Sequence, residues 1–142
     1  MKVQGFHHLA IQVKALEEVA GFYREVLGLA EIERHHGADG QLRSIWLDVG
    51  GGGFLALERV EASPSPDPDY RDGRPGLFLV ALRIACADRE RIRSDLERRG
   101  VPLVHETRWT LYVRDPEGNR VALSHHPDGT SQPPLVGFSS TS

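Results

Sequence analysis

The sequence predicts an α+β protein built from two copies of one βαβββ module, and three observations lead to this prediction. A strand, a helix, a glycine stop and three further strands occur twice in the same order. The spacing from His8 to Gly28 nearly equals the spacing from Leu79 to Gly100. A proline-rich stretch separates the two copies, as expected between modules.

The first module is predicted over residues 5–59. Its opening strand, 5–13, alternates Leu9 and Ile11 with less apolar neighbours, which is the period of a half-buried strand. The segment ALEEVAGFYREVLGL repeats apolar residues at helical spacing, and Gly28 is expected to end that helix in the left-handed conformation. The turn-rich stretches GADG and GGGG separate three further strands, which are expected at 29–36, 42–49 and 54–59.

The second module is predicted over residues 77–125, after a linker at 60–76 that is rich in proline and has no hydrophobic period. Its strand and helix are expected at 77–85 and 88–99, with Asp88 as the N-cap, Ile92 and Leu96 facing the core and Gly100 as the stop. The turn DPEGN precedes the last of three short strands, which are expected at 103–106, 109–114 and 120–125. Residues 126–142 are expected to form a tail. The two modules, the linker and the tail together are predicted to make one domain, residues 1–142.

Composition and charge exclude several classes of protein. The chain of 142 residues has a formal net charge of −3, which provides no basic field for nucleic acid. Its single cysteine, Cys86, excludes an internal disulfide framework. No apolar run has the length of a membrane-spanning helix, and the N-terminus lacks the apolar stretch of a signal peptide. We therefore expect a cytoplasmic protein that binds neither nucleic acid nor membranes.

Two segments resemble the vicinal oxygen chelate superfamily, which includes glyoxalases, bleomycin-resistance proteins and extradiol dioxygenases. The segment HHLAIQVKALEEVAGFYREVLGL is similar to the family's first strand and helix, and LYVRDPEGNRVALS resembles its closing hairpin and last strand. The resemblance covers residues 5–125. It implies a curved mixed sheet around a cavity, with the helices on the convex side, and such proteins often form homodimers.

Enzymes of this superfamily hold a divalent metal such as Mn, Fe, Ni or Zn with side chains from the first and fourth strand of each module. Carried over to this chain, the resemblance places His8, Ala56, Leu79 and Ala122 at these positions. Only His8 can coordinate a metal, since the alanine and leucine side chains carry no donor atom. We therefore expect no metal cofactor, and whether the chain is an enzyme stays open. A shift of one residue in strand register would change this expectation.

If the apolar residues of each strand pack under the helices, their neighbours face the cavity. These neighbours form a small apolar centre with aromatic and charged groups around it, which suits a small organic ligand. The residues expected to bind the ligand are His8, Trp46, Phe54, Glu58, Arg83, Tyr112 and Arg120. Several have a structural alternative, since Trp46 is also a candidate core residue, Glu58 a candidate ion-pair partner and His8 a candidate core histidine.

The sequence also contains two pairs of adjacent histidines, His7–His8 and His35–His36. Neighbouring residues in a strand point to opposite faces, so neither pair is expected to bind a metal from one side. Both pairs are interpreted as incidental.

These observations favour a protein that binds a small organic molecule without the family metal, like the drug-sequestering members of the superfamily. The alternative is a metal-dependent lyase, isomerase or dioxygenase of the glyoxalase type that uses His8 as one ligand. A third possibility is a structural or regulatory subunit without a ligand. The identity of the ligand is not determined by the sequence, since one fold serves many functions.

Overall fold

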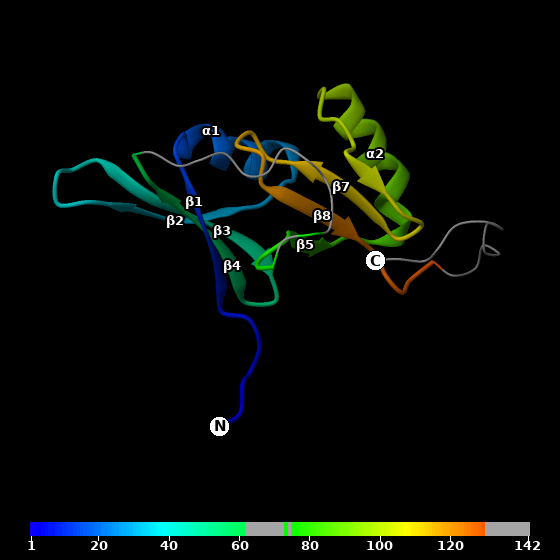
Figure 1. Ribbon diagram of the computed structural model, residues 1–142, viewed down its shortest axis with the longest axis horizontal. Helices are drawn as coiled ribbons and strands as arrows, with labels where there is room; N and C mark the ends of the chain where they lie inside the picture. Colours follow the sequence, from blue (N-terminus) through cyan, green and yellow to red (C-terminus); the bar gives the residue numbers. More distant parts are fainter. Residues whose placement is uncertain (62–72, 74, 130–142) are drawn as a thin grey trace. The chain divides into compact units, whose positions relative to one another are not determined.

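The structure is a computed structural model that describes residues 1–61, 73 and 75–129 (Figure 1). The other residues of the predicted linker and tail lie outside the described part. The chain divides into two compact units, Met1–Pro66 and Asp67–Ser142. Each unit has one four-stranded mixed sheet and its own helical segment between the first and second strands. The α+β fold with two βαβββ modules is therefore confirmed.

Unit 1 contains sheet A and a helical segment that changes type along its length. The helical segment is α1 (Leu16–Gly21), followed directly by the π-helical turn η1 (Phe22–Val26). Gly28 then adopts a φ of 74°, which confirms the predicted left-handed stop. The strands are β1 (His8–Val13), β2 (Glu31–His36), β3 (Leu42–Gly50) and β4 (Gly53–Arg59). Their order in sheet A is β1-β4-β3-β2, with β1 parallel to β4 and the other pairs antiparallel.

The core of unit 1 lies between α1 and the two central strands, β3 and β4. Complete burial of an aliphatic or aromatic side chain contributes about 1.5–3 kcal/mol. The fully or almost fully buried residues of this core are Val13, Val19, Ala20, Tyr23, Ile45, Leu47, Leu55 and Leu57. Leu9 and Ile11 point to the same side but are only half-buried, because β1 is the edge strand of sheet A.

Unit 2 repeats this arrangement with shorter strands. The strand β5 (Val80–Arg83) leads through the 3₁₀ turn η2 (Cys86–Asp88) into α2 (Arg89–Arg98), and Gly100 ends the helix with a φ of 72°. The remaining strands are β6 (His105–Glu106), β7 (Thr110–Arg114) and β8 (Arg120–Ser124). Their order in sheet B is β5-β8-β7-β6, with β5 parallel to β8. The order of strands is thus the same in the two sheets.

Asp88 precedes α2 as predicted, but the prediction that its side chain caps the helix is wrong. Asp88 has helical backbone angles, φ −90° and ψ −7°, because the chain enters α2 through the turn η2. An N-cap side chain reaches the backbone N–H groups only from an extended backbone conformation. The Asp88 carboxylate instead pairs with Arg91 at 3.1 Å. Of the two residues predicted to face the core, Leu96 is buried and Ile92 is half-buried.

Charged groups connect α2 to the edge of sheet B. Glu106 of β6 accepts hydrogen bonds from Arg93 and, at 2.8 Å, from Arg89. Arg89 also donates to the carbonyl of Thr107 at 2.7 Å. The Arg93 guanidinium, followed by that of Arg89, lowers the pKa of Glu106 from 4.5 to about 2. The carboxylate therefore stays charged at any moderately acidic pH.

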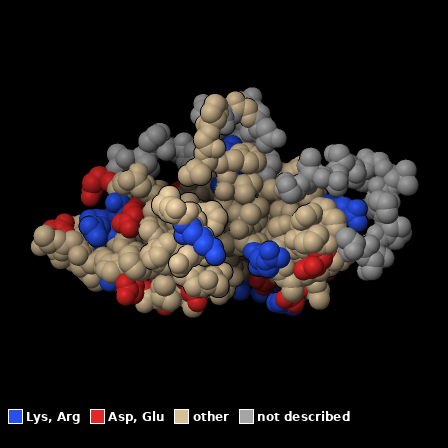
Figure 2. Space-filling view, turned by 90° about the horizontal axis from the view of Figure 1, so that it is seen from below, with Lys and Arg blue, Asp and Glu red and all other residues tan. Residues whose placement is uncertain are grey.

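None of the helices in the described residues is long and apolar enough to cross a membrane. Lys and Arg side chains alternate with Asp and Glu on the face shown in Figure 2, and neither sign gathers into one large area there. This agrees with the small net charge of −3.

We expect Glu106→Gln to destabilise the protein at neutral pH by about 0.5–1 kcal/mol, a value discounted because the carboxylate is partly exposed to solvent. A depressed pKa in the folded state gives stability that is complete above the unfolded value of 4.5 and is lost as the pH falls towards about 2. The variant should therefore lose less stability than the wild type between these two values. Urea unfolding measured across this range checks the prediction.

Glu90→Gln is the matched control, since Glu90 also pairs with Arg93 but its side chain is 76% exposed. An equal loss of stability in the two variants would show that the Glu106 ion pairs between α2 and β6 contribute no more to stability than the exposed Glu90–Arg93 pair.

Candidate functional site

The candidate binding residues lie, in each unit, on the face of the sheet that is opposite the helix of that unit, which we call the far face. Strand register decides which side chains share it. In sheet A, His8 lies beside Phe54, Ala10 beside Ala56, and Trp46 also beside Ala56. These residues alternate with the buried core positions Leu55 and Leu57, so they point away from α1. The predicted distribution of residues between the two faces of sheet A is confirmed.

A row of aromatic rings crosses the far face of sheet A, and we call it the aromatic row. Trp46 stacks on Phe54 with ring centroids 4.4 Å apart and planes at 24°. Phe54 stacks in turn on His8 at 4.9 Å and 12°. His35 lies against the other side of Trp46 at 4.5 Å, and His7 lies edge-on to His8 at 5.1 Å. The row therefore includes one residue from each strand of sheet A, together with His7.

Trp46 has a polar group without a partner within the described part of the chain. Its ring is half-buried, and the indole Nε1–H is shielded from solvent but donates to no acceptor there. A buried donor without a hydrogen bond costs about 1–3 kcal/mol. An acceptor atom on a bound molecule would recover this free energy.

The structure corrects the interpretation of the first histidine pair. The Nδ1 atoms of His7 and His8 lie 2.8 Å apart, so the two rings meet on one side of the chain. The argument from opposite strand faces fails because β1 begins at His8, and His7 is not yet part of the strand. Gly5, with a φ of 131°, turns the chain just before this point. His35, from the second pair, contacts Trp46 and was also missed as part of the site.

The far face of sheet B carries the remaining predicted residues. Arg83 lies beside Ser124, and Tyr112 lies beside Ala122, so both share a face with Arg120, two residues before Ala122. Tyr112 is only 4% exposed, and its ring lies 5.3 Å from that of His105. The guanidinium of Arg120 lies 5.0 Å from the ring centroid of Phe78, in cation–π contact. No carboxylate belongs to this face among the paired residues of sheet B.

The seven predicted ligand-binding residues thus form two groups. The group in unit 1 is His8, Trp46, Phe54 and Glu58, all on the far face of sheet A. The group in unit 2 is Arg83, Tyr112 and Arg120, all on the far face of sheet B. Ring contacts connect the first three members of the unit 1 group directly.

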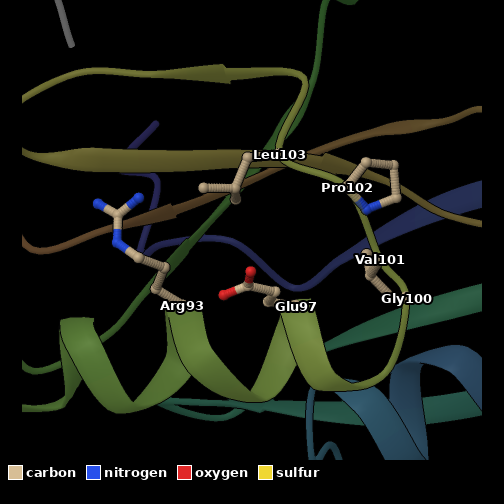
Figure 3. Close-up of a pocket in the computed structure, with 6 residues that line it drawn as sticks. All are labelled: Arg93, Glu97, Gly100, Val101, Pro102 and Leu103. Atoms are coloured by element: carbon tan, nitrogen blue, oxygen red, sulfur yellow. The ribbon is translucent and has the colours of Figure 1, made fainter.

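A shallow groove lies elsewhere in unit 2, beside the C-terminal end of α2 (Figure 3). It has a volume of about 440 Å³ and is lined by Arg93, Glu97, Gly100, Val101, Pro102 and Leu103. Arg93 is already bound to Glu106 and Glu90. None of the predicted ligand-binding residues lines this groove, so we do not assign the candidate site to it.

With the two far faces established, the comparisons with known proteins identify the family. The family model of the Glyoxalase/Bleomycin resistance protein/Dioxygenase superfamily matches residues 5–123. The chain belongs to this superfamily. Among curated protein sequences, none matches the chain significantly.

Solved structures of the glyoxalase superfamily share the fold of this chain at low sequence identity. A glyoxalase/dioxygenase from Nostoc punctiforme has 19% identity and a TM-score of 0.73, over 88% of this chain and 92% of that chain. Lactoylglutathione lyase from Agrobacterium tumefaciens has 20% identity and a TM-score of 0.62, over 89% and 96%. The fosfomycin resistance protein FosX from Listeria monocytogenes, in complex with Mn(II) and 1S,2S-dihydroxypropylphosphonic acid, has 15% identity and a TM-score of 0.67, over 87% and 93%. At these identities the likeness concerns the fold alone.

The residues present do not fit the metal that the glyoxalase superfamily implies. Strand register places Ala56 on the same face as His8, so the position expected for a second ligand carries a methyl group. Ala122 occupies the equivalent position on sheet B, beside Ala81. Among the described residues, no group of three or more His, Cys, Asp or Glu side chains is arranged to hold a metal ion. We therefore derive no chemical step through such a metal.

Large rings fill the space at both alanine positions. Ala56 and Ala122 are each 2% exposed, and each lies directly across from an aromatic residue on the adjacent strand, Trp46 or Tyr112. A glutamate at either position would need the volume that the ring occupies, and its carboxylate would lose solvent.

We therefore expect Ala56→Glu to lower the free energy of unfolding by about 2 kcal/mol or more. Ala10→Glu is the matched control, because Ala10 lies beside Ala56 on the same face but is exposed, and it should change stability by less than about 0.5 kcal/mol. Urea unfolding of the two variants checks the prediction. Equal stability would mean that the position expected for the family glutamate is open rather than closed by Trp46.

Proposed function

We propose that the protein binds a small organic molecule with an aromatic or other flat apolar part against the far face of sheet A, without the metal of the superfamily. The observation that carries this proposal is the stacking of Trp46, Phe54 and His8 across three strands of sheet A. Aromatic side chains that are half-buried or exposed on a sheet face are typical walls of a ligand site. The buried Nε1–H of Trp46 offers such a molecule a hydrogen-bond donor.

The second group of predicted residues, in unit 2, has a different chemistry that we consider by itself. Arg83, Tyr112 and Arg120 share the far face of sheet B. Guanidinium groups bind carboxylates and phosphates through paired hydrogen bonds. An acidic group therefore suits the far face of sheet B, and, independently, a donor group suits Glu58 on the far face of sheet A.

The proposal includes a homodimer and a cytoplasmic location for the single domain of residues 1–142. The dimer is supported by the edge strands β1 and β2 of sheet A and β5 and β6 of sheet B, each of which leaves one row of backbone groups unpaired within its sheet. Sedimentation at several protein concentrations separates monomer from dimer. The metal-dependent lyase, isomerase or dioxygenase that uses His8 is the alternative outcome of the binding experiments.

The binding proposal is tested by the fluorescence of Trp46. The chain has two tryptophans, so Trp109→Phe leaves Trp46 as the reporter. We expect a planar aromatic compound from a library to quench this fluorescence saturably. Phe54→Ala should weaken binding about tenfold, because it removes the ring that stacks on Trp46.

Gln12→Ala is the matched control, since Gln12 is exposed on the far face of sheet A but makes no ring contact in the aromatic row. Its affinity should equal that of the parent. If no compound gives saturable quenching, or if Gln12→Ala and Phe54→Ala weaken binding equally, the aromatic row is not the ligand site.

A further inference from the structure

The contact between His7 and His8 brings two metal-binding atoms together at the start of β1. Their Nδ1 atoms are 2.8 Å apart, and both residues are exposed. Two nitrogens bound side by side to one metal ion, at about 2.0 Å and at the right angle of square-planar coordination, lie about 2.8 Å from each other. The separation in the structure thus already equals the one that such an ion requires.

The orientation of the two imidazoles is fixed by their surroundings. Phe54 contacts both rings, stacking on His8 at 4.9 Å and meeting His7 edge-on at 5.4 Å. The carbonyl of His7 accepts a hydrogen bond from the backbone N–H of Phe54 at 3.3 Å, which ties the backbone before β1 to β4. Less side-chain freedom is therefore lost when both rings bind one ion.

We propose that His7 and His8 form a two-histidine site for a late first-row divalent cation, with Cu²⁺ bound more tightly than Ni²⁺ or Zn²⁺. Imidazole nitrogens suit these ions, and Cu²⁺ has the highest affinity in the series. In the metal-free pair one Nδ1 donates its proton to the other. Coordination through both Nδ1 atoms requires the donor ring to carry that proton on Nε2 instead, so each ring stays neutral.

This site differs from the metal site of the superfamily, and it shares only His8 with the three stacked rings proposed to bind an organic molecule. The position that the superfamily implies uses His8 together with side chains from other strands, whereas the site proposed here uses His7 and His8 and leaves the remaining coordination positions to water. Because both histidines are exposed at the edge strand of sheet A, an ion reaches them without displacing any core residue.

The test is a titration of the full chain, without an affinity tag, with CuCl₂ in the presence of glycine as a weak competing chelator. We expect one equivalent of Cu²⁺ to bind, with nitrogen hyperfine structure from two imidazoles in the electron paramagnetic resonance spectrum. His7→Ala and His8→Ala should each weaken binding at least about tenfold, because each removes one of the two ligands. His7→Gln serves as a second variant that retains a polar side chain at this position.

His36→Ala is the matched control, since His36 is also exposed and next to a histidine, but it belongs to strand β2. Its affinity for Cu²⁺ should equal that of the wild type. Binding that depends on His8 but not on His7, or that weakens equally in His36→Ala, would overturn the proposal. Quenching of Trp46 by an organic ligand in the absence of metal is measured separately, so a negative result for Cu²⁺ leaves that proposal intact.

Discussion

The parallel pairing of β1 with β4 sets the arrangement on which the candidate site depends. This register places His8 beside Phe54 and Ala10 beside Ala56, and the antiparallel pairing of β3 with β4 brings Trp46 to the same face. A shift of one residue would move every side chain of β1 to the opposite face. Val13 of β1 is fully buried and Leu9 and Ile11 are half-buried on the helix side, so such a shift would expose apolar surface worth about 1.5–3 kcal/mol for a fully buried residue.

In both units an aromatic residue lies across from an alanine at a position where the resemblance to the superfamily implies a metal ligand. A large aromatic ring lies across from a buried alanine, as Trp46 does from Ala56 in sheet A and Tyr112 does from Ala122 in sheet B. Each small residue makes room for the ring on the adjacent strand. Each far face thus carries a methyl group beside an aromatic ring at this position, and such surface suits apolar and stacking contacts.

The two far faces carry side chains of opposite charge. Sheet A combines its aromatic row with Glu58 and Asp48 on the same face, whereas sheet B presents Arg83 and Arg120 there. On the opposite side of sheet B, the ion pairs of Glu106 with Arg89 and Arg93 hold α2 against the edge strand β6. Arg89 and Arg93 thus lie on the helix side of sheet B, whereas Arg83 and Arg120 lie on its far face.

The sequence by itself determined the order of the elements, the two glycine stops and the residues that share each far face. These features follow from local periodicity, because the strand period of two and the helix period of 3.6 are visible in any single segment. Only the tertiary structure decided that Trp46, Phe54 and His8 stack, and that Trp46 and Tyr112 lie across from the two alanines. Such contacts join strands that are distant along the chain, and no local pattern specifies their register.

His7, just before β1, is a residue whose contacts the local sequence pattern did not predict. Strand alternation placed His7 and His8 on opposite faces, but alternation holds only where the backbone is extended and paired. The turn at Gly5 and the beginning of the strand at His8 bring both Nδ1 atoms to one side. Where a strand begins depends on its hydrogen bonds to β4, so this contact was settled by the sheet and not by the sequence around it.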